Sequence, residues 1–136
     1  MIRLLDVNAM IAAAWPAHIA HAPTVRWFAQ NQSSGPLAIA TCPLTELEFL
    51  RLFLVLKGYA PDLALAQEAL RLFTHAPQRR HVFWPDALRA RQLPAWVKEP
   101  QQIADGYLVA LAAKHSGRLL LLDTAIPAHP VVELIA

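Results

Sequence analysis

Residues 2–8 read IRLLDVN and residues 118–123 read RLLLLD, and these two stretches decide the fold class. Each is a short apolar run that ends in an aspartate, which is typical of a buried strand followed by a polar turn. Leu37–Thr41 is a third apolar run, and His81–Trp84 and Val131–Ile135 are two shorter candidates. Strands that are apolar along their whole length predict a parallel sheet with both of its faces covered.

The segments between these strands have the patterns of helices. Leu44–Leu56 is dense in apolar residues, and Gln101–His115 repeats them on one helical face before Gly117 ends the helix. Asp62 can cap a further helix that runs to about His75. Alternating strands and helices predict an α/β fold, with a mostly parallel central sheet between helical layers. Two more helices are expected, from Asn8 to Trp15, before Pro16, and from Pro23 to Gln30.

The chain has 136 residues, the length of one domain, and we expect that domain to span residues 1–136. Hydrophobic residues make up 56% of the sequence and charged residues 16%, which is enough apolar material for a packed core. No apolar run reaches the roughly 18 residues that a membrane span needs, and no signal-peptide pattern is present. Cys42 is the only cysteine, so an intrachain disulfide is excluded and a reducing, cytoplasmic location is expected.

Four acidic residues are expected to meet at one edge of this sheet. Asp6 and Asp123 each follow a strand directly. Asp105 lies in the first turn of a helix, and Glu46 lies near the start of another. The carboxyl ends of parallel strands and the N-termini of the helices that follow them share one edge, where open α/β sheets bind ligands. A single fold can therefore bring the four carboxylates together.

Carboxylates that lie so close together need a cation between them. Each close pair repels by about 4 kcal/mol at an effective dielectric of about 20. Oxygen ligands without sulfur favour Mg²⁺, with Mn²⁺ as a second candidate. Such ions activate water and stabilise the charge that develops on a phosphodiester, which points to a nuclease. Each acid also has a purely structural interpretation, as a turn residue, a helix cap or a partner of a helix dipole.

The formal net charge of +2 understates the basic character of the remaining surface. If four of the ten acids surround a metal ion, twelve Lys and Arg residues are left with six acids. Such a surface attracts a polyanion and guides it by release of counterions, as expected of an RNA-binding protein.

In four segments the sequence resembles the acidic motifs of the PIN-domain family, in the family's order and spacing. These segments are Leu4–Asn8, Thr41–Leu47, Ile103–Leu108 and Leu121–Asp123. The similarity extends over nearly the whole chain. Further segments resemble the VapC branch of toxins, namely Ala14–Pro16 with His18 and His21, Trp27–Phe28, and Phe83–Asp86.

The resemblance implies a PIN-like three-layer α/β/α sandwich and a Mg²⁺-dependent endoribonuclease, the toxin of a toxin–antitoxin pair that cleaves structured cellular RNA. It implies that Asp6 and Asp105 ligate the metal directly and that Glu46 and Asp123 complete the catalytic site. It also implies a cognate antitoxin that covers the acidic edge, and a homodimer. No membrane association is expected.

Two neighbouring residues are assigned by their spacing from these acids. Asn8 lies two residues after Asp6 and is a candidate to orient its carboxylate. Glu48 lies two residues after Glu46, and helical positions i and i+2 point to different faces, so Glu48 is left outside the expected site.

Two positions depart from the family pattern and keep other functions open. The family often has Ser or Thr two residues before its final aspartate and directly before its helix aspartate, whereas this chain has Leu121 and Ala104. Loss of both hydroxyls leaves as an alternative a PIN-like module that binds RNA or a partner without cutting. The order Asp6, Val7, Asn8 also faintly resembles haloacid-dehalogenase phosphatases, although those need a second aspartate where Asn8 stands.

Arg51, Trp96 and Lys98 are the candidate RNA contacts. Trp96 and Lys98 lie in Leu93–Pro100, a loop that contains two prolines, where an exposed ring can stack on a base. Arg51 interrupts an apolar helix, so it either contacts phosphate or extends its stem out of a buried position. The other three tryptophans are expected in the core.

Overall fold

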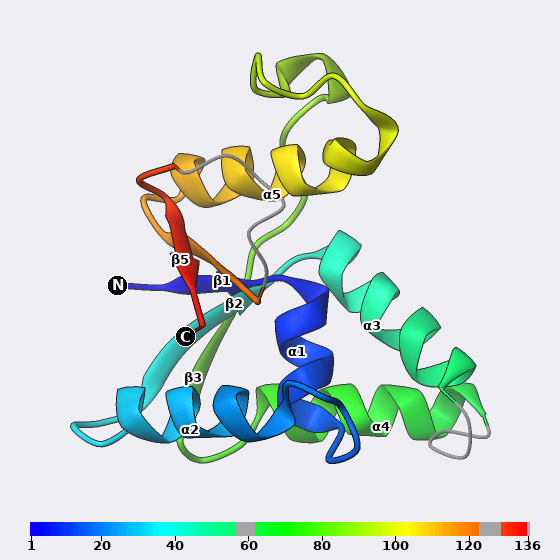
Figure 1. Cartoon of the computed structure of the whole chain (residues 1–136), viewed down its shortest axis with the longest axis vertical. Helices are drawn as coiled ribbons and strands as arrows, with labels where there is room; N and C mark the ends of the chain where they lie inside the picture. The colour runs from blue at the N-terminus through cyan, green and yellow to red at the C-terminus, as the bar shows by residue number, and fades with distance from the viewer. Residues whose placement is uncertain (57–61, 123–128, 136) are drawn as a thin grey trace.

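The computed structural model describes residues 1–56, 62–122 and 129–135. Within these residues, five parallel strands form one sheet in the order β3-β2-β1-β4-β5 (Figure 1). The apolar runs quoted above therefore pair side by side at the centre, with Leu5 opposite Leu120. The strands are β1 (Arg3–Leu5), β2 (Leu37–Thr41), β3 (Arg79–Phe83), β4 (Arg118–Leu121) and β5 (Val132–Leu134).

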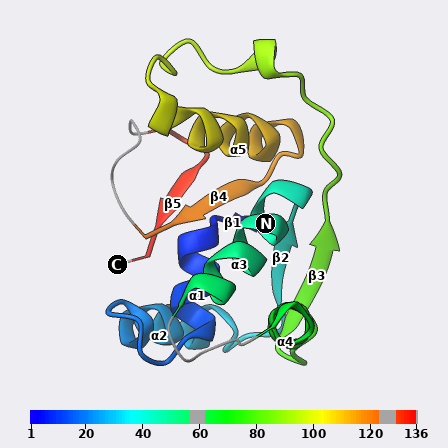
Figure 2. The same cartoon turned by 90° about the vertical axis from the view of Figure 1, so that its right-hand side faces the viewer.

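Helices cover both faces of the sheet, as Figures 1 and 2 show. One core contains Leu5, Ile39 and Phe49, and lies between the sheet and four helices. The other contains Leu4 and Leu111, and lies beneath a single helix on the opposite face. The three-layer α/β/α arrangement is confirmed. The four helices are α1 (Val7–Ala14), α2 (His21–Asn31), α3 (Pro43–Val55) and α4 (Leu63–Thr74), and the single helix is α5 (Ile103–Lys114).

The N-termini of α3 and α4 have capping residues that the sequence makes recognisable. Oδ1 of Asp62 accepts a 2.9 Å hydrogen bond from the backbone N–H of Leu65, so the predicted cap of α4 is confirmed. At α3, the Thr45 hydroxyl oxygen lies 3.1 Å from both the N–H and the C=O of Cys42. These bonds fix the turn that links β2 to α3 and aim the first turn of α3 at the edge of the sheet.

The end of α5 follows the prediction for a different physical reason. The residue with a left-handed backbone is Ser116, with φ of 55°, and not Gly117. A Cβ on Gly117 would lie 2.7 Å from the carbonyl oxygen of Ile2 and 2.7 Å from the ring of Trp84. Glycine is required there because the chain passes close to β1 and a buried tryptophan.

β3 begins two residues earlier than predicted, at Arg79. The Arg79 guanidinium lies 4.9 Å from the ring centroid of Phe28 and 4.4 Å from that of Phe73, and donates a 2.6 Å hydrogen bond to the Phe73 carbonyl. By its charge alone Arg79 would be taken for an ordinary solvated residue, but its long side chain packs between aromatic rings. Arg80 is exposed.

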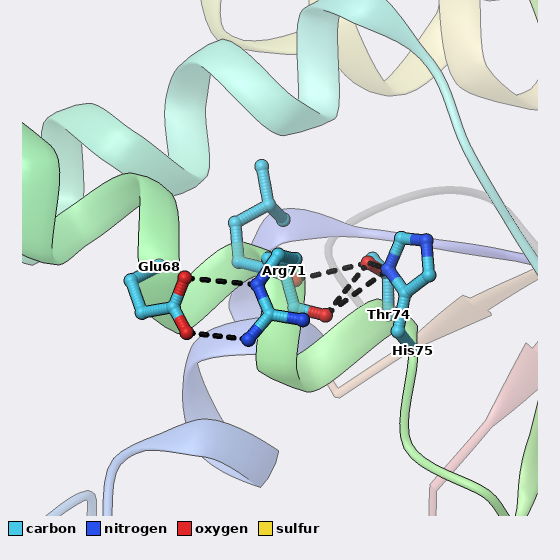
Figure 3. Close-up of polar contacts among 5 residues, drawn as sticks. Glu68, Arg71, Thr74 and His75 are labelled. Carbon is cyan, nitrogen blue, oxygen red and sulfur yellow. Dashed lines mark hydrogen bonds and ion pairs between the residues drawn. The ribbon is translucent and has the colours of Figure 1, made fainter.

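The end of α4 that precedes β3 carries polar contacts at the surface (Figure 3). The Arg71 guanidinium donates hydrogen bonds of 2.9 and 2.5 Å to the two carboxylate oxygens of Glu68. The Thr74 hydroxyl donates to the carbonyl of Leu70, 3.0 Å away. The exposed ion pair contributes little to stability.

Among the described residues, no helix is long and apolar enough to cross a membrane.

Candidate active site

Asp6 occupies the carboxyl end of β1 and caps α1. Its side chain is almost buried, with 8% exposed, and Oδ2 accepts a 3.3 Å hydrogen bond from the backbone N–H of Asn8. The structural interpretation of Asp6 as a helix cap is therefore correct. It is compatible with a role in the site, because the cap restricts the carboxylate to one orientation. Asn8 contributes to that orientation through its backbone N–H.

A pocket of about 280 Å³ opens where α1, α3 and α5 meet. Asp6 and Asn8 line it at the start of α1, Asp105 lines it from the first turn of α5, and Glu48 lines it from α3. The structure thus brings together Asp6, Asn8 and Asp105, which the sequence had singled out. Asp123 lies outside the described residues. The remaining lining residues are Val7, Leu44, Thr45, Ala104 and Leu108.

Glu46 lies in the first turn of α3 but is not among the residues that line this pocket. The hydroxyl of Thr41, the last residue of β2, donates a 2.6 Å hydrogen bond to Oε2 of Glu46. Nε2 of His81 lies 2.6 Å from the same hydroxyl oxygen. Glu46 is therefore held at the carboxyl end of β2, beside the pocket, by a chain of hydrogen bonds that reaches β3.

Glu48, which the sequence analysis left outside the expected site, lines this pocket from α3. Glu48 and Glu46 do point to different sides of α3, as their spacing requires, but it is Glu48 that lines the pocket. The sequence could not indicate which side faces inward, because α3 is apolar nearly all round and leaves Leu47 65% exposed. Nη2 of Arg51 donates a 2.7 Å hydrogen bond to Oε2 of Glu48, so a positive charge lies next to the pocket.

The charge states of Glu46 and His81 determine which group donates the proton in each hydrogen bond of Thr41. Burial lowers the pKa of His81 below its ordinary value, with the Glu46 carboxylate opposing that shift. His81 is therefore neutral at pH 7. Because the Thr41 hydroxyl donates its proton to Glu46, its oxygen accepts from His81, which must carry its proton on Nε2.

The candidate RNA contacts differ in how accessible they are. The Arg51 side chain is 61% exposed, so its guanidinium is accessible to a phosphate. Lys98 is exposed, whereas Trp96 is half-buried and packs against the core beneath α5. Trp27 and Trp84 are buried as expected, and Trp15 packs at the edge of the other core.

The donors in the pocket suit a hard divalent cation. Across residues 1–56, 62–122 and 129–135, no three His, Cys, Asp or Glu side chains are placed to hold one ion together. Magnesium is usually held by one or two carboxylates, keeps several waters and takes its remaining oxygens from substrate phosphates. Asp6 and Asp105, two carboxylates that line one pocket, fit that mode of binding.

A parallel α/β/α sandwich with aspartates at the carboxyl edge of its sheet is the arrangement expected of a PIN-type domain. No family model matches the sequence. The chain is 36% identical over 135 residues to Ribonuclease VapC39 of Mycobacterium tuberculosis, and the match covers 93% of this chain and 91% of that protein. Ribonuclease VapC29 of the same organism is 34% identical over 127 residues, covering 93% and 89%. Ribonuclease VapC38 is 34% identical over 125 residues, covering 90% and 86%.

A solved structure agrees with the fold. The structure of VapBC2 from Rickettsia felis, bound to a DNA fragment from its promoter, matches 98% of both chains with a TM-score of 0.65 at 12% sequence identity. At that identity the similarity establishes the fold alone. The sequence matches establish the family: this chain belongs to the VapC ribonucleases.

Proposed function

We propose that this chain is the toxin of a toxin–antitoxin pair and cleaves structured cellular RNA by Mg²⁺-dependent hydrolysis. The observation that carries the proposal is the pocket lined by Asp6 and Asp105 at the carboxyl edge of the sheet. Relatives named as ribonucleases, matched over about nine tenths of the chain, support the reaction class. Asp6, Asp105, Glu46 and Asp123 are the proposed catalytic residues.

Asp6 and Asp105 are the proposed ligands of Mg²⁺, with Mn²⁺ as a substitute. When bound, the ion supplies activation of water and stabilisation of the charge that develops on the phosphodiester. Glu46, which accepts a hydrogen bond from Thr41, is proposed to act through water. Glu48 adds a negative charge at the pocket itself and is a further candidate for orienting the metal's water ligands.

The exposed cations around the pocket are proposed to guide RNA to it. Arg51 and Lys98 are exposed cations, and the excess of basic residues outside the pocket favours a polyanion. The phosphodiester backbone is proposed to contact Arg51 and Lys98. The exposed part of the Trp96 ring is proposed to stack on a base.

The proposed partners are an antitoxin protein and a second copy of this chain. A structural neighbour that contains both VapB and VapC supports the antitoxin. By covering the pocket, an antitoxin would exclude RNA from Asp6 and Asp105. The reducing cytoplasm is the proposed location, consistent with a chain that has a single cysteine, the buried Cys42.

Sequencing of cellular RNA ends after brief expression tests this function. The wild-type chain should create a small set of new RNA ends at defined positions. Asp6→Asn should abolish them, because the substitution keeps the shape of the side chain and removes its charge. Glu68→Gln, on the exposed side of α4, is the matched control and should leave the ends unchanged. A wild-type pattern that matches that of Asp6→Asn would instead favour a module that binds without cutting.

A further inference from the structure

A second pocket, of about 370 Å³, lies directly beside the acidic one and shares Leu44 and Ala104 with it. Its volume is within the range of about 300–1,000 Å³ that is usual for ligand sites. Its walls are apolar except for Asp86 and the hydroxyl of Tyr107. The other lining residues are Leu88, Ala90, Leu93 and Ile103.

The wall that α5 provides is more exposed than expected for the apolar face of a helix. The apolar pattern of Gln101–His115 indicates one buried face that includes Ile103, but Ile103 is 52% exposed and lines this pocket. Gly106 allows the neighbouring segment to pack tightly against α5, since a Cβ there would lie 2.2 Å from Cγ2 of Val97. The pocket is thus formed by a closely packed segment and one helix, and leaves an apolar surface open beside the carboxylates.

We propose that this second pocket binds an unstacked guanine base of the RNA, next to the phosphodiester that is cut. The proposal rests on the ribonuclease function above and adds a base preference to it. Proteins that read single-stranded RNA hold splayed bases against aromatic and apolar side chains and hydrogen-bond their Watson–Crick edges. Leucine and isoleucine walls with one carboxylate provide such a site.

Asp86 is the group that selects the base. Guanine presents two adjacent donors on its Watson–Crick edge, N1–H and the N2 amino group, and a carboxylate presents two acceptors. Uracil presents one donor flanked by two carbonyl oxygens, which a carboxylate repels. The Tyr107 hydroxyl donates a hydrogen bond to Oδ1 of Asp86 and so orients the carboxylate. Burial and this hydrogen bond raise the pKa of Tyr107, so the phenol stays protonated as a donor.

Charge favours RNA over an apolar peptide as the occupant. The wall from Leu88 to Leu93 also carries Arg89 and Arg91, and both are exposed. Two cations on the rim of an apolar pocket suit a base whose flanking phosphates lie at the surface. An apolar segment of a partner would use the walls but leave these cations without a matching charge.

Binding is tested separately from cleavage with mononucleotides as probes. The full chain carrying Asp6→Asn is titrated with GMP, AMP, CMP and UMP, while the methyl NMR signals of Leu88, Leu93 and Ile103 are followed. GMP should shift these signals at a concentration about tenfold lower than UMP does, a ratio expected for one bidentate hydrogen-bonded pair. Equal shifts with all four nucleotides, or none, would overturn the proposal.

The cleavage test uses a single-stranded RNA library of random sequence with the wild-type chain, Asp86→Asn and Ala90→Trp. Wild type should cut beside guanine, and both variants should lose about tenfold of that preference in kcat/KM. Ala90→Trp fills the pocket and leaves the Tyr107–Asp86 contact in place. It therefore still tests the base site if Asp86→Asn fails to fold. Glu68→Gln is again the control.

The two tests separate the base site from the ribonuclease function. If GMP binds as expected but wild type cuts neither the library nor a structured RNA, the ribonuclease function fails and the base site remains. If RNA is cut with a base preference that neither variant alters, the base site fails and the ribonuclease function remains. Variants that weaken antitoxin binding and leave the cleavage pattern unchanged would identify the pocket as a partner surface and likewise overturn the proposal.

Discussion

The hydroxyl of Thr41 donates a 2.6 Å hydrogen bond to the carboxylate of Glu46, and so joins the last residue of β2 to the first turn of α3. Thr41 is fully buried and Glu46 half-buried. A hydrogen bond to a charged acceptor contributes about 1.5–3 kcal/mol, more than a neutral one. The bond therefore both stabilises the fold and determines where Glu46 sits relative to the acidic pocket.

Thr41→Val should lower the free energy of unfolding by about 1–3 kcal/mol, because it keeps the shape of the side chain but leaves Glu46 and His81 without their shared partner. Urea unfolding measures this change. Thr24→Val is a matched control, since Thr24 is also fully buried and its hydroxyl finds no hydrogen-bond partner among the described residues. The control should be neutral or stabilising. Equal losses in both variants would mean that the Thr41 bond contributes nothing.

Glu48→Gln should raise the Mg²⁺ concentration for half-maximal RNA cleavage by roughly tenfold, because it removes a charge from the pocket. Glu46→Gln should shift the Mg²⁺ dependence less, since Glu46 does not line that pocket. Glu68→Gln removes a carboxylate from an exposed ion pair of the same kind on α4, and should leave the Mg²⁺ dependence near that of wild type. A larger shift from Glu46→Gln than from Glu48→Gln would mean that Glu46 contributes more than Glu48 to the metal site, as the sequence suggested.

The stability should depend on pH through His81. Burial lowers its pKa in the folded chain, so the unfolded chain binds a proton more readily. The stabilisation from neutral His81 is present above its unfolded pKa of about 6.5 and is lost as the pH falls through the lower folded pKa. Urea unfolding between about pH 7.5 and pH 5 should show this loss. His81→Gln should reduce the pH dependence, whereas His129→Gln, at an exposed position that does not contribute to the His81 shift, should preserve it.

Cys42 should be unreactive in the folded chain. The side chain is fully buried, and burial raises the pKa of its thiol, so little reactive thiolate forms at neutral pH. A thiol reagent such as DTNB should modify it at the rate of unfolding, and quickly once urea is added. Rapid modification in native buffer would show that the turn between β2 and α3 opens readily.

The strands could be predicted because apolar runs carry a direct signal. Leu37–Thr41 has the predicted bounds, and the acids after β1 and at the start of α5 do reach one pocket. The choice between Glu46 and Glu48 could not be predicted, because the apolar pattern of α3 does not distinguish its faces. Arg79 was misjudged because sequence patterns show its charge and not the two phenylalanine rings beside it.

Cleavage of a structured RNA by the purified chain, titrated with Mg²⁺, is the most direct measurement of whether Asp6 and Asp105 form a metal-dependent nuclease site. Wild type should cut only when Mg²⁺ or Mn²⁺ is added. Asp6→Asn and Asp105→Asn should each lose cleavage at all Mg²⁺ concentrations, while circular dichroism shows both variants folded. Cleavage by wild type in excess EDTA, or by either folded variant at the wild-type rate, would contradict a metal site at these two aspartates.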